Sequence, residues 1–239
     1  MVFKALVGSH NYNLNTAESD KDYKVFVLPT FEDLYNQKMY ANQTVGETED
    51  IHIHDIRKFP SLLYKANINF LEVLFSNEIT ISSDLSRTQE TLINLIFNRK
   101  NDIAVMNLPH LFNSCGGMHL NKMKMLYKGT EGTQHLVDAF GYDTKQALHA
   151  YRVLNFICKF AESDFKDFEG AMTYSDEERK FMLDIKGGFF NAQTYENFVT
   201  FYHDAKFKIL KERYYSFEPN EKLRDELEEV VMEIVKISM

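Results

Sequence analysis

A Gly-Ser turn between two short apolar segments is the feature that most constrains the fold of this chain. Leu6-Val7 ends one predicted strand, Gly8-Ser9 leaves it, and residues 23–28 form a second strand that Pro29 ends. Glycine permits a tight turn, in which backbone N–H groups and the Ser9 hydroxyl approach a phosphate closely. The sequence therefore predicts two neighbouring strands with an anion-binding turn at one end.

Two carboxylates stand directly before the second strand, in the segment Ser19-Asp20-Lys21-Asp22. Side chains alternate along an extended chain, so Asp20 and Asp22 are expected on one face. Hard cations such as Mg²⁺ prefer oxygen ligands together with substrate phosphates. An Asp-x-Asp pair by itself is more often a solvated strand end, but its position after the Gly-Ser turn favours a metal-binding pair.

A third carboxylate is expected on the next alternating segment, Asp50-Ile51-His52-Ile53-His54. The period of two predicts a strand with Asp50, His52 and His54 on one face. Asp50 is the candidate third metal ligand, and the neighbouring Glu49 is the alternative. In that role Asp50 would also draw a proton from an attacking hydroxyl. The two histidines are interpreted as ordinary polar-face residues outside the metal-binding set.

The order of extended and helical patterns predicts an α+β fold. A short helix is expected at residues 31–35, a loop at 36–47, and a helical segment from residue 55 with Pro60 in its first turn. The strand signals end near Leu85. Further helices are expected at residues 91–97, 118–127, 144–161, 175–186, 195–211 and 220–237. The fold is therefore a small mixed sheet followed by a helical lobe.

The overall composition is that of an ordinary globular protein with an acidic balance. The 239 residues carry a net charge of −8 and include two cysteines, Cys115 and Cys158, without metal-ligand spacing. No apolar run is long enough to cross a bilayer, and the N-terminus does not read as a signal peptide. A cytoplasmic protein is expected. Phosphate neutralisation supplies most non-specific affinity for nucleic acid, so any RNA contact should be a local basic patch.

A row of potentially cationic side chains follows Gly141-Tyr142-Asp143. Lys145, His149 and Arg152 stand at positions i, i+4 and i+7, which places them on one helical face, opposite the apolar side. Lys145 also lies in the first helical turn, where the helix dipole favours an anion. A solvated face is the simpler explanation of the row taken alone. Beside a metal-carboxylate site, binding of nucleotide or RNA phosphates becomes the better interpretation.

Taken together in order, these segments resemble one family, the polymerase β superfamily nucleotidyltransferases associated with RNA repair ligases in bacteria and phages. The resemblance spans about the first 160 residues, and Lys186-Gly187-Gly188 resembles a later segment of that family. It rests on Gly8-Ser9, Ser19-Asp20-x-Asp22, Asp55-Ile56-Arg57-Lys58-Phe59, Lys65-Ala66-Asn67-x-x-Phe70-Leu71-Glu72-Val73-Leu74, and Gly141-Tyr142-Asp143-Thr144-Lys145-x-x-x-His149-x-x-Arg152. His10-Asn11-Tyr12-Asn13 departs from the usual Arg-Ala-Tyr-Gly, which affects the phosphate contacts but not the carboxylates.

The resemblance implies a metal-dependent transfer of NMP from an NTP such as ATP to an acceptor hydroxyl, with Mg²⁺ or Mn²⁺ as the cofactor. Asp20, Asp22 and Asp50 are then the catalytic and metal-binding residues. Residues 1–100 would form the catalytic core and residues 101–239 a helical lobe packed with it as one unit. The candidate nucleotide-binding residues are Gly8, Ser9, Lys58, Glu72, Lys145, His149 and Arg152.

Two of these candidates have an equally simple structural interpretation. Glu72 stands among apolar residues and needs a partner if it is buried, but it could also lie on the wet side of a helix. Lys58 could contact the nucleotide or lie on a solvated helix start. The most plausible acceptor is an RNA 3′ end, reached through a local patch that includes Lys122, Lys124 and Lys128. A protein or small-molecule acceptor, and a catalytically silent nucleotide- or RNA-binding protein, are the alternatives. The sequence leaves the base preference and the oligomeric state open.

Overall fold

The computed structural model covers residues 1–239 and describes all of them except residue 47. The chain divides into two compact units, which are described separately. The first comprises residues 1–107 together with 219–239, and the second comprises residues 108–218.

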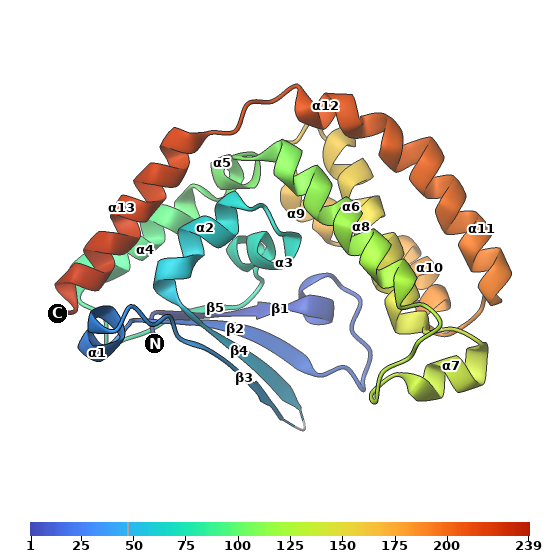
Figure 1. Cartoon of the computed structure of the whole chain (residues 1–239), viewed down its shortest axis with the longest axis horizontal. Helices are drawn as coiled ribbons and strands as arrows, with labels where there is room; N and C mark the ends of the chain where they lie inside the picture. Colours follow the sequence, from blue (N-terminus) through green and yellow to red (C-terminus); the bar gives the residue numbers. More distant parts are fainter. Residues whose placement is uncertain (47) are drawn as a thin grey trace. The chain divides into compact units, whose positions relative to one another are not determined.

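A five-stranded mixed sheet forms the base of the first unit (Figure 1), in the order β3-β4-β2-β1-β5. Strands β2 and β4 are parallel, and every other neighbouring pair in the sheet is antiparallel. The strands are β1 (Phe3–Val7), β2 (Lys21–Val27), β3 (Ala41–Val45), β4 (Glu49–Asp55) and β5 (Ile79–Ile81). The predicted α+β class, with a small mixed sheet ahead of a mainly helical region, is confirmed.

Helices cover one face of this sheet (Figure 1). They are α2 (Phe59–Tyr64), α3 (Ile68–Leu71), α4 (Arg87–Asn98), α5 (Lys100–Ala104) and α13 (Glu221–Ile237), while the short α1 (Phe31–Tyr35) follows β2. Phe3 and Phe26, partners on β1 and β2, stack with ring centroids 4.8 Å apart. Phe59 of α2 packs on both, and Phe97 of α4 packs edge-on against Phe3. Each such pair contributes about 0.5–1.5 kcal/mol beyond the burial of its area.

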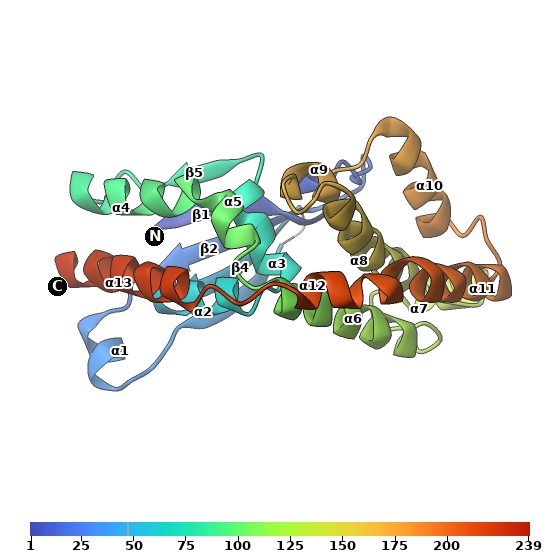
Figure 2. The same cartoon turned by 90° about the horizontal axis from the view of Figure 1, so that it is seen from above.

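The last helix, α13, completes the first unit by packing beside α2 and α4 (Figure 2). Its apolar stripe is buried, and the Gln89 side-chain amide of α4 donates to the Ile234 carbonyl at 2.9 Å. Arg99 and Glu226 form an ion pair across the same contact. Residues 219–239 therefore group with the N-terminal part of the chain, whereas the division expected at residue 100 placed them in the helical lobe.

The second unit is entirely helical among its regular elements, and α8 runs through its core. Its helices are α6 (Leu108–Lys124), α7 (Gln134–Phe140), α8 (Thr144–Glu162), α9 (Phe168–Met172), α10 (Asp176–Lys186), α11 (Ala192–Tyr202) and α12 (Lys211–Tyr215). Two buried tyrosines donate their hydroxyls to α8 carbonyls, Tyr195 to Ala147 and Tyr214 to Ile157. These bonds satisfy polar groups that would otherwise be costly to bury.

Most predicted elements are present, and one segment that was expected to be a loop contains a strand. The helix at 31–35, the strand containing residues 50–54, the first-turn Pro60 and the Ser175/Glu178 capping box are confirmed. The loop expected at residues 36–47 instead contains strand β3, and residue 47 lies outside the described residues. Every residue of β3 is exposed at the sheet edge, so its sequence lacks the alternation that marks a half-buried strand.

Two helices also differ in extent from the sequence pattern. The helix expected at 118–127 begins ten residues earlier, at Leu108, and the helix expected at 195–211 is interrupted by a π-turn at His203–Phe207. Cys115 and Cys158 are free, buried thiols, and burial raises the pKa of both well above the usual range. Among the described residues, no helix combines the length and apolarity needed to span a membrane.

Candidate active site

The parallel pairing of β2 with β4 brings two of the predicted carboxylates together. Asp22 and Asp50 are partners in register, so their side chains project from the same face of the sheet. Lys24 and His52 form the next pair on that face, and Phe26 and His54 the pair after that. The face therefore changes along the strands from acidic to apolar, and its apolar end is the part that packs on α2.

Glu49, the alternative third carboxylate, projects from the opposite face. Its carboxylate pairs with the Lys4 ammonium at 3.6 Å, and Lys4 also lies over the Tyr23 ring. The strand register thus separates the two neighbouring acids. Asp50 lies on the face of Asp22, whereas Glu49 lies on the opposite face and pairs with Lys4. The third predicted ligand, Asp20, lies just before β2 and is exposed.

The Gly-Ser turn lies against Asp22. Gly8 has a φ of +74°, a backbone conformation that favours glycine, and a Cβ at this position would lie 2.4 Å from Asp22 Oδ2. Ser9 follows in the short 3₁₀ helix Gly8–Asn11, where its carbonyl accepts hydrogen bonds from the N–H groups of Tyr12 and Leu14. The absence of a side chain at Gly8 therefore leaves room for the Asp22 carboxylate beside the turn.

Glu72 is buried, with 2% of its surface exposed, and its carboxylate is bound by the protein itself. It accepts hydrogen bonds from the Gly8 backbone N–H, at 3.1 Å, and from the Tyr12 hydroxyl, and it pairs with the Lys24 ammonium at 3.6 Å. Glu72 thus has the partners that a buried carboxylate needs, so the alternative of a solvated helix face is wrong, while its nucleotide contact stays a prediction. For the same reason the Gly8 N–H points to Glu72 and not toward an open phosphate site.

Lys24 and Tyr12 are the residues that the sequence interpretation missed at this site. Lys24 is 9% exposed, follows Asp22 on the same sheet face and pairs with Glu72, and its ammonium lies 5.4 Å from the centre of the Phe70 ring. Its place one alternation after Asp22 is the signal that could have identified it. Nearby, burial lowers the pKa of His54 to about 4, and the charge of Lys24 adds to this effect.

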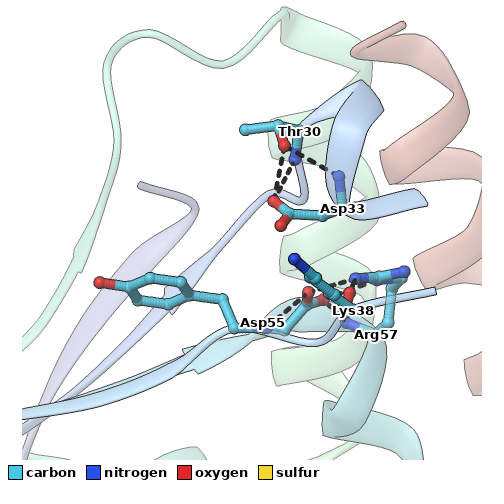
Figure 3. A network of polar contacts seen from close by, with 6 residues as sticks. Thr30, Asp33, Lys38, Asp55 and Arg57 are labelled. Atoms are coloured by element: carbon cyan, nitrogen blue, oxygen red, sulfur yellow. Dashed lines mark hydrogen bonds and ion pairs between the residues drawn. The ribbon is translucent and has the colours of Figure 1, made fainter. Parts of the chain in front are cut away.

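A polar network fixes the far end of β4 (Figure 3). Asp55 is fully buried and accepts two hydrogen bonds from the Arg57 guanidinium and one from the Arg57 backbone N–H. Burial opposes ionisation of Asp55, but these bonds outweigh it and hold its pKa below the usual value. Arg57 also donates to the Lys38 carbonyl, which ties the chain entering β3 to the end of β4. Lys58 follows directly and is partly exposed, and its nucleotide contact stays a prediction.

The described residues contain no cluster of three or more His, Cys, Asp or Glu side chains arranged to hold a metal ion. The structure thus brings Asp22 and Asp50 to one face but does not assemble Asp20 with them into a ready ligand set. The oxygen chemistry of the Asp22–Asp50 pair fits a hard cation such as Mg²⁺.

The predicted cationic row lies in the second unit, on α8, and only its first member is solvated. Lys145 is exposed, His149 is partly buried, and Arg152 is 4% exposed. Burial, together with the charges of neighbouring cations, lowers the pKa of His149 to about 3, so its imidazole is neutral at physiological pH. The expectation of three cations opposite the apolar side is corrected, because α8 is buried on nearly all sides.

A mixed sheet whose Gly-Ser turn adjoins paired strand carboxylates is the arrangement expected of polymerase β-like nucleotidyltransferases. The chain belongs to the RNA repair pathway DNA polymerase beta family, because the model of that family matches residues 1–232. The family identified from the sequence segments is therefore confirmed, and with it the general class of transferase. Comparison with curated proteins and with solved structures gave no match.

Proposed function

We propose that this protein transfers NMP from an NTP to an acceptor hydroxyl in a metal-dependent reaction. The observation that carries the proposal is the pairing of Asp22 with Asp50 on one sheet face, next to a turn whose glycine leaves space for Asp22. Family membership supports the same chemistry, since the family is polymerase β-like and is named for an RNA repair pathway.

In this proposal Asp22 and Asp50 would hold the cation, and Asp20, one alternation before Asp22, would be the third ligand. A bound Mg²⁺ or Mn²⁺ would supply positive charge against the triphosphate and the leaving pyrophosphate. Asp50 accepts the proton of the acceptor hydroxyl, whose oxygen forms the new bond to the α-phosphorus as the bond to the β-phosphate oxygen breaks. The Ser9 hydroxyl, at the turn beside Asp22, orients a phosphate oxygen.

Glu72 and Lys24 are buried residues that support this site. The Glu72 carboxylate holds the Gly8 N–H and the Tyr12 hydroxyl, which fixes the backbone of the turn relative to β2. Lys24 balances the buried charge of Glu72. A catalytic group must be held within a fraction of an ångström of its productive position, so this support matters for rate as well as for stability.

The acceptor proposed is an RNA 3′ end, because the family is named for RNA repair. A protein or small-molecule acceptor uses the same chemistry and is the second candidate. A catalytically silent binding protein is the third, and the retained Asp22–Asp50 pair argues against it, since binding alone does not require paired carboxylates.

The decisive experiment incubates the full chain with each labelled NTP, with Mg²⁺ or Mn²⁺, and with RNA, DNA or no added acceptor. Label transfer to RNA supports the full proposal, and transfer to the protein or to a small molecule supports the second candidate. Asp20→Asn or Asp22→Asn should reduce transfer at least about 100-fold while the fold is retained. Transfer at the wild-type rate by either variant at saturating metal would overturn the metal-ligand assignment.

A further inference from the structure

In the second unit, α6 and α8 pack antiparallel in a register fixed by two hydrogen bonds. The His119 Nδ1 atom lies 3.0 Å from the Ala150 carbonyl, and the Asp143 N–H donates to the Leu126 carbonyl at 2.7 Å. Lys122, in the last turn of α6, lies between these two contacts. The register therefore places it level with the N-terminal turns of α8.

The contacts between α8 and α10 place the C-terminal end of α10 beside the same N-terminal turns of α8. Lys159 of α8 pairs with Glu178 at 2.9 Å, the Tyr151 ring packs edge-on against Phe181, and the Tyr142 hydroxyl donates to the Phe190 carbonyl. The α10 chain thus runs toward the N-terminus of α8 as its residue numbers rise. Lys186 is the last residue of α10 and lies between the Phe181 and Phe190 contacts. Interpolation between those contacts brings it beside the turn from Lys145 to His149.

The electrostatics agree with this geometry. After burial, the charges that lower the pKa of His149 are those of Arg152, Lys122, Lys145 and Lys186, and each of them is positive. Burial also lowers the pKa of Lys122, and the charges of Arg152 and Lys145 act in the same direction against the opposing charge of Asp143. Asp143 is fully buried as the N-cap of α8, where it accepts from the Gln146 N–H.

Four cations from three helices thus gather around one neutral imidazole, with one buried carboxylate near them. The lowered pKa of Lys122 shows that burial and the neighbouring cations outweigh the opposing charge of Asp143, so the charged form of Lys122 is held there at a cost in free energy. An anion with several negative oxygens would offset that cost. The N-terminal turn of the 19-residue α8 adds backbone N–H groups and a favourable dipole to the same place.

We infer that Lys122, Lys145, Arg152 and Lys186 form one anion site within residues 108–218, which binds the phosphate groups of a nucleotide or of an RNA strand. His149 is the neutral hydrogen-bonding member of the site. The identity of the ligand as a nucleotide or RNA rests on the proposed function, whereas the convergence of the cations does not. The inference enlarges the predicted row on α8 by two lysines from other helices.

The test measures binding, not turnover, and uses the full chain carrying Asp22→Asn so that no transfer is required. The probes are inorganic tripolyphosphate, ATP, and a labelled oligoribonucleotide without terminal phosphates. Lys122→Ala, Lys145→Ala and Lys186→Ala should each weaken binding of the phosphate probe about tenfold or more, as expected for a lost charge-assisted contact. His149→Ala should weaken it less. Circular dichroism and thermal melts confirm that each variant is folded.

Lys180→Ala is the matched control, because Lys180 is an exposed lysine on the same helix as Lys186. It should leave the affinity for every probe unchanged. Weakening for tripolyphosphate and ATP assigns the site to nucleotide phosphates. Weakening for the oligoribonucleotide alone, with a log–log salt slope that is shallower by about 0.7 per lost contact, assigns it to RNA phosphates.

The inference would be overturned if, for each of the three probes, the three lysine variants bound as tightly as the wild type. It would also be overturned if Lys180→Ala lost as much affinity as the three lysine variants do. These outcomes are separable from failure of the proposed function. If no acceptor is labelled by the wild type but tripolyphosphate binding responds to the three lysines, the anion site stands and the transfer chemistry falls. If transfer proceeds but the lysine substitutions have no effect on binding, the proposed transfer chemistry stands and the anion site is wrong.

Discussion

The backbone N–H of Gly8 donates a hydrogen bond to the buried carboxylate of Glu72, with 3.1 Å between the nitrogen and Oε2. The two residues are 64 positions apart, so this bond joins the turn after β1 to the segment after α3. The turn is the one that lies against Asp22, and its position is therefore set from outside the strand pair. The same carboxylate also holds Tyr12 and Lys24, so the support is a small network.

Replacement of Glu72 should test this support. Glu72→Gln retains the side-chain shape but leaves the buried Lys24 ammonium without its ion-pair partner, so the free energy of unfolding should fall by about 1–3 kcal/mol. Nucleotidyl transfer should fall as well, mainly in kcat, because the turn loses its fixed position. Urea denaturation and steady-state kinetics measure the two effects. Glu18→Gln, at an exposed position, is the control and should change neither.

Gly8 should tolerate no side chain. In Gly8→Ala the φ of +74° costs about 1–2 kcal/mol, and the new methyl group would meet Asp22 Oδ2. We expect a lower melting temperature together with a large loss of transfer activity. Gly132→Ala is the matched control, since a Cβ there meets nothing within 4 Å. Full activity in Gly8→Ala would show that the turn can move away from Asp22 without consequence.

The register of β4 distinguishes its two neighbouring acids. Asp50→Asn should abolish transfer because Asp50 shares a face with Asp22, whereas Glu49→Gln should be nearly normal because it breaks only a partly exposed pair with Lys4. Transfer assays on the two purified variants check this directly. If Glu49→Gln is the inactive variant, the register of β4 is shifted by one residue, which moves every side chain to the other face.

Stability should fall on mild acidification. The pKa values of His54, His119 and His149 are lowered in the folded protein, chiefly by burial, to about 4 for His54 and about 3 for His149. Below the ordinary histidine pKa of about 6.5 the unfolded chain binds protons that the folded chain does not, so the free energy of unfolding decreases as pH falls.

The loss is at most about 1.4 kcal/mol per pH unit for each histidine. Urea denaturation at pH 7.5 and pH 5.5 measures it, above the range in which the stabilising carboxylates such as Asp55 and Glu178 titrate. His149→Gln should flatten the pH dependence in this window. An unchanged slope in that variant would mean that His149 takes up protons equally in the folded and unfolded protein, so that its pKa is not lowered by folding.

The sequence predicted the elements whose signals are local, and it missed those that depend on distant partners. The alternation of residues 50–54 separated Asp50 from Glu49 correctly, and capping residues marked the start of α10. Strand β3 was missed because an exposed edge strand buries no alternating face. The partners of Glu72 could not be read from the sequence, since Gly8, Tyr12 and Lys24 reach it only after the sheet has formed. Arg152 was placed opposite the apolar side of its helix, because helical spacing does not reveal that α8 is enclosed on nearly all sides.

The grouping of α13 with the N-terminal residues has a consequence for how the protein is made. The chain that builds the helical unit, residues 108–218, is contiguous and is synthesised before α13. The sheet-bearing unit, in contrast, waits for Leu223, Leu227 and Ile234 before the surface of α2 and α4 is covered. Contacts of such long sequence separation slow folding, because a large loop must close before they form. The nascent protein therefore carries an incomplete N-terminal unit until α13 has been synthesised.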